Sequence, residues 1–95
     1  MTMTYSKAVS RIRLDSTDFA TELDNMQFEE NGNEYVYHVT KGSFLFEENA
    51  EFLSIQRKKS GQASFQEVDG FCLTNFPNVG VALNTAKRIL DAREA

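Results

Sequence analysis

The chain has 95 residues, of which 41% are hydrophobic and 25% charged, and its formal net charge is −4. This size and balance predict a single small globular domain over residues 1–95 and argue against a disordered chain. The single cysteine, Cys72, excludes an intrachain disulfide, and no apolar run is long enough to cross a membrane. We therefore expect a soluble cytoplasmic protein that does not contact a membrane.

The charge is distributed unevenly along the chain. Residues 1–14 carry three bases and no acid, whereas residues 15–51 carry ten acids against one base, Lys41. Seven of these acids lie between residues 15 and 34. This segment is the main candidate for a surface that binds a positively charged partner.

The first third of the chain has weak local signals. Polar and apolar residues alternate near the end of residues 5–14, which favours a strand. Phe19, Leu23 and Met26 are spaced by four and three residues, so residues 16–25 are predicted to form a short helix. The same segment also alternates polar and apolar residues, and a strand remains the alternative.

The clearest turn signal is Asn31-Gly32, because both residues readily adopt the positive φ angles that a type I′ turn requires. A two-residue loop at this point places Phe28 opposite Tyr35 and Glu29 opposite Glu34. The predicted hairpin therefore has two distinct faces. One face carries Met26, Phe28, Tyr35, Tyr37 and Val39, and the other carries Gln27, Glu29, Glu34, Val36 and His38.

Further turn signals continue the sheet as a meander. They occur at Lys41-Gly42, Glu48–Ala50, Ser60-Gly61 and Asp69-Gly70, the last as a second type I′ candidate. They would separate strands at Ser43–Glu47, Glu51–Lys58, Ala63–Val68 and Phe71–Thr74. Phe44-Leu45-Phe46 is apolar on both faces, so we expect its strand to be covered on both sides.

The last element is a helix that Asn78 caps and that runs to about Arg93. Its apolar stripe is Val79, Ala82, Leu83, Ala86, Ile89 and Leu90. The predicted fold is α+β: an antiparallel β-meander of about five to six short strands, a C-terminal amphipathic helix packed on one face, and a short helix in the N-terminal half.

Catalytic and metal-binding patterns are missing from the sequence. A nucleophilic site would need Cys72 beside the single histidine, His38, and a lone cysteine in a strand is usually a small hydrophobic residue. The acids of residues 15–24 do not have the spacing of a calcium loop, and no Cys/His cluster suits zinc. We predict no catalytic residue, no enzymatic activity, no metal and no cofactor.

Direct binding to nucleic acid is also disfavoured. Arg57, Lys58 and Lys59 form a basic run, and Phe28, Tyr35 and Tyr37 resemble a stacking surface. However, the acidic segment adjoins these aromatics, and the sequence pI is about 4.9. A phosphate backbone would be repelled by such a surface.

The acidic segment contains repulsions that a merely solvated surface would avoid. Asp18 and Glu22 are four residues apart in the predicted helix, and Glu29 is opposite Glu34 in the predicted hairpin. Local inconsistencies of this kind tend to mark functional surfaces. The predicted partner-binding residues are the charged Asp15, Asp18, Glu22, Asp24, Glu29, Glu30 and Glu34, with Tyr35 and Tyr37 as neighbouring anchors.

These observations predict a non-enzymatic interaction protein, similar in size and charge to the small inhibitors that phages and mobile elements make. Its acidic face would bind the basic groove of a nucleic-acid-processing protein, because carboxylates pair with Arg and Lys much as phosphates do. The alternative is a small-molecule or nucleotide binder, with a pocket near Val36 and Leu45 on the uncovered face, in a homodimer. A weaker alternative is an enzyme that depends on Cys72.

Overall fold

The computed structural model describes residues 3–44 and 47–95. Its helices are α1 (Tyr5–Ser10), α2 (Phe19–Leu23) and α3 (Val79–Glu94), and its strands are β1 (Met26–Glu30), β2 (Asn33–Phe44), β3 (Glu47–Lys58) and β4 (Gln66–Cys72). The strands form one antiparallel sheet in the order β1-β2-β3-β4. The α+β meander is therefore confirmed, with four strands in the described residues instead of five to six.

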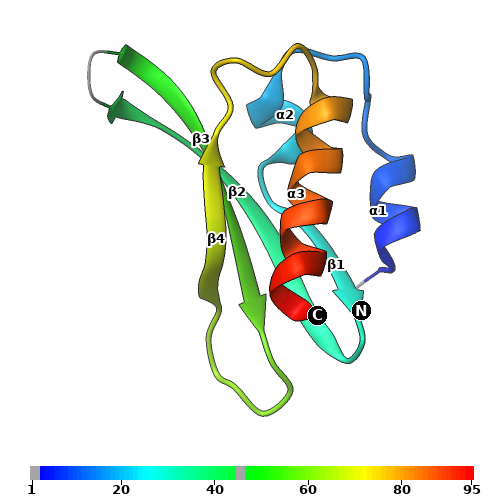
Figure 1. The fold of residues 1–95 in the computed structure, drawn as a ribbon. Coiled ribbons are helices and arrows are strands. Elements are labelled where there is room, and N and C mark those ends of the chain that lie inside the picture. The colour runs from blue at the N-terminus through cyan, green and yellow to red at the C-terminus, as the bar shows by residue number, and fades with distance from the viewer. Residues whose placement is uncertain (1–2, 45–46) are drawn as a thin grey trace.

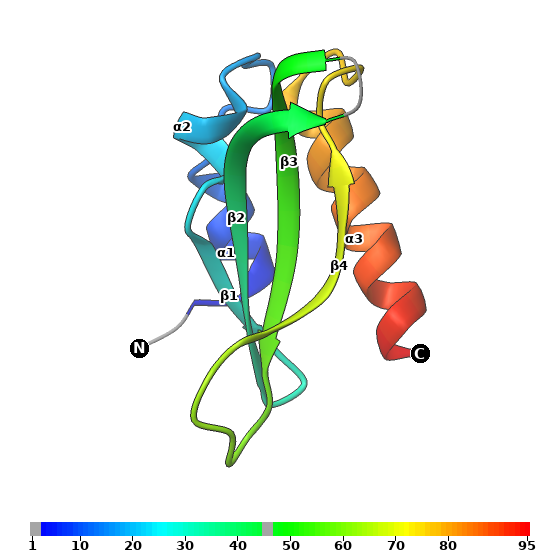
Figure 2. The same ribbon diagram turned by 90° about the vertical axis from the view of Figure 1, so that its left-hand side faces the viewer.

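The helices lie on one side of the sheet (Figure 1). α1 and α3 cover this face, which we call the inner face, and α2 lies at one end of it. The opposite, outer face carries no helix, as the rotated view shows (Figure 2). The expected packing of the C-terminal helix on one face is confirmed.

The strand predicted over residues 5–14 is wrong, because α1 forms there. Thr4 caps it, with Oγ1 accepting the N–H of Lys7 at 3.4 Å. The alternation that favoured a strand spans only four residues. The residues that contact the core are at helical spacing: Tyr5, Ala8, Val9 and Ile12.

The helix predicted over residues 16–25 is confirmed in a shorter form, α2. Asp18 caps it: Oδ1 accepts the Thr21 N–H at 3.1 Å, and Oδ2 accepts the Thr21 hydroxyl at 2.7 Å. Phe19 and Leu23 are buried. Asn25, at φ 63°, then reverses the chain into β1.

The hairpin between β1 and β2 has the predicted register. Phe28 pairs with Tyr35 and Glu29 pairs with Glu34. Asn31 and Gly32 have φ angles of 54° and 81°, as the type I′ turn requires. The turn chemistry therefore fixes which residues face the helices.

The turns predicted at Lys41-Gly42 and Glu48–Ala50 are wrong. Both segments are strand, and Gly42 pairs directly with Ala50. Gly42 does not have a positive φ, so this glycine does not turn the chain. The predicted strand through Phe44-Leu45-Phe46 lies partly outside the described residues.

The turn predicted at Asp69-Gly70 is also wrong, because both residues lie within β4. Gly70 pairs with Ser54, and a Cβ at Gly70 would be 2.8 Å from the Leu53 carbonyl oxygen. The close approach of two strands, not a positive φ, therefore requires glycine. Asp69 accepts the Gly70 N–H at 2.7 Å through Oδ1 and the Nε–H of Arg93 at 3.0 Å through Oδ2.

The turn at Ser60-Gly61 is present, with Gly61 at φ 87°, but the strand that follows begins at Gln66 instead of Ala63. The Gln62 N–H donates to the Lys59 carbonyl oxygen at 3.0 Å and closes the turn.

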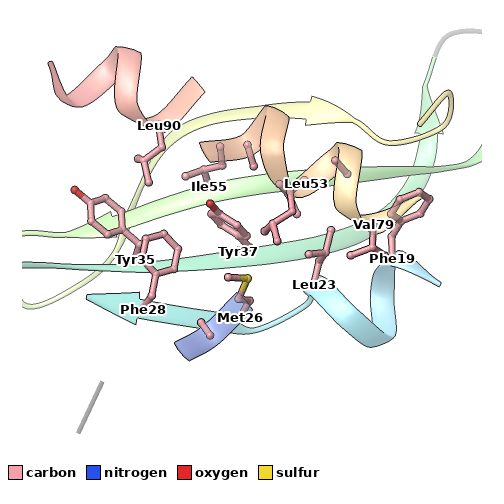
Figure 3. Packing of buried hydrophobic residues seen from close by; sticks show 14 of the residues in the cluster. Phe19, Leu23, Met26, Phe28, Tyr35, Tyr37, Leu53, Ile55, Val79 and Leu90 are labelled. Atoms are coloured by element: carbon pink, nitrogen blue, oxygen red, sulfur yellow. The ribbon is translucent and has the colours of Figure 1, made fainter. Parts of the chain in front are cut away.

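The core lies between the inner face and the helices (Figure 3). Asn78 caps α3, with Oδ1 accepting the Val81 N–H at 3.0 Å, as predicted. The buried residues of α3 are Val79, Ala82, Leu83, Ala86 and Leu90. They pack against aromatic and aliphatic side chains of the strands, including Tyr35, Tyr37, Leu53 and Ile55.

Candidate functional site

The seven predicted acids do not form one surface. Asp15, Asp18, Glu22 and Asp24, here called the α2 acids, lie on α2 and its flanking residues. Glu29, Glu30 and Glu34, here called the hairpin acids, lie at the β1–β2 turn, at the other end of the sheet (Figure 1). The length of β1 separates the two groups.

Two of the three hairpin acids pair with lysines, one of which, Lys87, is shared with Asp91. Glu30 accepts two hydrogen bonds from Lys87 Nζ, at 2.7 and 2.9 Å. Glu34 Oε2 lies 3.2 Å from Lys58 Nζ, because β3 places Lys58 directly opposite Glu34. The predicted repulsion between Glu29 and Glu34 is thus partly offset by a lysine on a third strand, which the sequence did not reveal.

Three of the four α2 acids are instead held in place by hydrogen-bond donors. Asp18 binds Thr21, Glu22 Oε1 accepts the Arg13 N–H at 2.7 Å, and Asp24 Oδ1 accepts the Val39 N–H at 2.9 Å. The hydrogen bonds from Thr21 lower the pKa of the exposed Asp18 carboxyl.

Within residues 3–44 and 47–95, no Lys or Arg forms an ion pair with an α2 acid. His38 Nδ1 lies 3.6 Å from Asp24 Oδ1. The contact between Glu22 and the Arg13 backbone also places the basic segment after α1 beside the α2 acids. This end of the molecule therefore presents both signs of charge.

Tyr35 and Tyr37 are not surface anchors, and this part of the prediction is wrong. Only 2% of Tyr35 and 0% of Tyr37 are exposed, because both side chains point into the core (Figure 3). The Tyr35 hydroxyl donates to Glu94 Oε1 at 2.7 Å. The Tyr37 hydroxyl is buried without a hydrogen-bond partner among the described residues, and burial raises its pKa far above the ordinary value.

A hollow of about 370 Å³ lies between α1, α2 and the start of β1. Arg11 of the α1 end and two of the α2 acids, Glu22 and Asp24, line it together with apolar side chains. Sequence reasoning missed this hollow because its wall includes α1, which had been assigned as a strand. The spacing of Tyr5, Ala8, Val9 and Ile12 was the signal that could have revealed it.

A second hollow, of about 690 Å³, lies over β3 and β4. Thr40, Phe52, Ser54 and Cys72 contribute to its lining. The small-molecule alternative expected a pocket near Val36 and Leu45. Val36 is not in this lining, and Leu45 lies outside the described residues.

The two residues of the weaker, enzymatic alternative do not meet. His38 is on β2 and Cys72 is on β4, so β3 keeps them roughly 10 Å apart. Cys72 Sγ lies 3.0 Å from the Thr74 hydroxyl oxygen, while the His38 ring faces Asp24. In the part of the chain that the structure describes, no three His, Cys, Asp or Glu side chains converge as metal ligands would.

None of the described helices is long and apolar enough to cross a membrane. Comparison with known proteins found no matching family model, no matching curated protein and no matching solved structure. A function for this chain is therefore inferred from its own residues and their geometry.

Proposed function

We propose that this chain is a non-enzymatic interaction domain whose α2 acids contact a basic surface of a protein partner. The observation that carries the proposal is the contrast between the two groups of acids. Lysines neutralise Glu30 and Glu34, whereas hydrogen-bond donors hold Asp18, Glu22 and Asp24 without removing their charge. Carboxylates that are already oriented lose less conformational entropy when a partner binds.

The mixed charge of this end supports a specific orientation of the partner. Arg11 and Arg13 follow α1 and border the α2 acids. A complementary partner would place Lys or Arg opposite the α2 acids and an acidic or neutral surface opposite α1. Such complementarity accelerates association and excludes partners with the wrong charge pattern.

The partner class that we propose is a nucleic-acid-processing protein, which the chain would inhibit. A groove that binds phosphates presents Lys and Arg side chains, and these side chains also pair with carboxylates. The hairpin acids are not part of this contact surface, because lysines of the same chain already engage two of them.

The test compares two triple variants that each remove three negative charges. The α2 variant is D18N/E22Q/D24N, in which each amide oxygen still accepts the backbone N–H that the carboxylate accepts now, so the asparagine that replaces Asp18 still caps α2. The control variant is E29Q/E51Q/E67Q, at acids outside the α2 group. Because the overall charge changes equally, any difference in binding reports the location of the acids.

Proteins retained by the immobilised wild-type chain from host extract would be identified, purified and titrated at low and moderate salt. We expect the α2 variant to weaken binding at least about tenfold and the control variant less than about threefold. We also expect the difference to shrink as salt is raised. Equal losses in both variants would refute the assignment of the contact surface to α2.

A further inference from the structure

The hollow between α1, α2 and β1 has the size of a small-ligand site. Its volume of about 370 Å³ lies within the range typical of pockets that bind small molecules. Its lining is chemically divided, with an apolar floor and charged side chains of both signs.

The floor of the hollow belongs to the hydrophobic core. Ala8 and Met26 are 5% and 7% exposed, and Met3 and Ile12 pack against the same core while lining the hollow. Methionine side chains are flexible and polarizable, so they adapt to apolar groups of different shape. An apolar side chain placed here would replace water on a surface that the core already holds in position.

The charged side chains of the hollow come from different elements. Arg11 is the C-cap residue of α1 and forms no ion pair within the described ranges. Glu22 and Asp24 come from α2 and its C-cap, and they are fixed by the N–H groups of Arg13 and Val39. One cationic group and two oriented carboxylates therefore line the same small space.

The edge of β1 that faces away from β2 is bridged by Thr4 at Glu29 and reaches the hollow at Gln27. Glu29 directs its N–H away from β2, to the Met3 carbonyl oxygen at 2.8 Å. Gln27 is two residues earlier on the same edge, so its N–H and C=O also point away from β2. Gln27 also lines the hollow.

From this combination we infer that the hollow binds a free α-amino acid with an apolar side chain. Arg11 would bind the α-carboxylate, Glu22 and Asp24 the α-ammonium group, and the floor of Met3, Ile12 and Met26 the side chain. The two carboxylates disfavour a phosphate-bearing ligand, and Arg11 disfavours a metal cation. A zwitterion with an apolar side chain matches all three parts of the lining.

The inference does not depend on the proposed protein partner, although the two share Glu22 and Asp24. The ligand test is therefore done with the purified 95-residue chain alone. L-Leucine and L-methionine are titrated by calorimetry and by amide chemical shifts. N-acetyl-L-leucine lacks the ammonium group, L-leucinamide lacks the carboxylate, and glycine lacks the apolar side chain.

We expect saturable binding of leucine or methionine and at least about tenfold weaker binding of each of the three analogues. Shifted amides should lie in α1, α2 and the first residues of β1. Absence of saturable binding by both amino acids up to millimolar concentration would overturn the inference. Equal binding of leucine and its analogues would overturn it too.

A matched pair of variants then tests whether the Arg11 guanidinium binds the α-carboxylate of the ligand. R11Q removes the guanidinium that lines the hollow, and R13Q removes an exposed guanidinium two residues away that does not line it. We expect R11Q to weaken leucine binding at least about tenfold and R13Q less than about twofold. Circular dichroism and thermal unfolding verify that both variants fold, and equal weakening by the two variants would contradict the assignment.

Discussion

The two faces of the sheet give neighbouring residues of one strand different surroundings. On β2, Tyr35 and Tyr37 face the helices and belong to the core. Val36 lies between them on the outer face, and it is 3% exposed although no helix covers that side. The helices therefore do not account for its burial. They build the core on one face, and the other face buries side chains without them.

The same alternation of faces determines which acids form ion pairs. Glu29 and Glu30 are adjacent in sequence, yet Glu30 reaches Lys87 of α3 while Glu29 lies on the outer face opposite Glu34. Successive side chains of a strand point to opposite faces, so a run of like charges in sequence is split in space. Acidity that is concentrated in sequence does not imply an acidic patch.

The largest expected effect is on the inner face, at Phe28. This side chain is fully buried, and its ring centroid lies 5.0–5.5 Å from those of Tyr5, Tyr35 and Tyr37. Phe28→Ala should lower the free energy of unfolding by about 3–5 kcal/mol, measured by urea denaturation. Phe52→Ala, on the outer face, should cost less than half as much. Equal losses would contradict the assignment of the core to one face.

A second comparison is between two strand glycines, one at a close approach of two strands and one with open space around it. Gly70→Ala places a Cβ about 2.8 Å from the Leu53 carbonyl oxygen, so the strands must shift. We expect the free energy of unfolding to fall by about 1–3 kcal/mol. Gly42→Ala is the control, because nothing lies within 4 Å of its Cβ, and it should change stability by less than about 0.5 kcal/mol. Thermal unfolding of both variants tests the difference.

A third effect concerns the connection between α3 and the sheet. Glu94 accepts hydrogen bonds from Arg57 Nη1 at 2.7 and 2.8 Å and from the Tyr35 hydroxyl. Glu94→Gln should therefore cost about 1–2 kcal/mol in urea denaturation. The control is Asp91→Asn on the same helix, which removes only an exposed ion pair with Lys87, one turn away. A Glu94→Gln loss no larger than that of the control would show that the pair adds little stability.

The same residue gives a dependence on pH. Hydrogen bonds from Arg57 lower the pKa of Glu94 below its ordinary value of 4.5. A lowered pKa in the folded state stabilises the fold at pH above that ordinary value, and this stabilisation is lost as pH falls through the folded pKa. Below pH 4.5, the wild-type chain should therefore lose stability more steeply than Glu94→Gln. Parallel acid denaturation curves would argue against this linkage.

The smallest expected effect compares two consecutive residues. Glu29→Gln removes a like charge opposite Glu34 and should raise the free energy of unfolding by roughly a few tenths of a kcal/mol. Glu30→Gln removes an ion pair with Lys87 and should lower it by about 0.5–1 kcal/mol. Chemical denaturation at low salt measures both. Changes of the same sign would contradict the placement of these residues on opposite faces.

Local chemistry allowed some elements to be predicted from sequence. Asn31-Gly32 fixed the register of the hairpin, and the long apolar stripe after Asn78 identified α3. Each signal acts within its own element, so no distant contact was needed. The turns predicted at Gly42 and Gly70 are wrong because neither glycine has a positive φ. At Gly70 two extended strands approach closely, whereas nothing lies within 4 Å of a Cβ at Gly42.

The candidate site was less predictable than the fold. The ion pair between Glu34 and Lys58 depends on the pairing of β2 with β3. The hollow at Arg11 depends on the placement of α1 and α2 around the start of β1. Neither follows from spacing along the chain. The burial of Tyr35 and Tyr37 was implied by the predicted hairpin face, but only if the helices cover that face.

The hydrogen bond from the Gly70 N–H to Asp69 has a consequence for self-association. β4 is an edge strand, and the register with β3 turns the Gly70 N–H toward solvent. Asp69 occupies this donor, and Arg93 holds the carboxylate there. This position therefore offers no unoccupied donor to another chain, which opposes strand addition at this edge. The same two contacts lower the pKa of Asp69, so its carboxylate stays ionised in more acidic solution. The Gly70 N–H therefore remains occupied there.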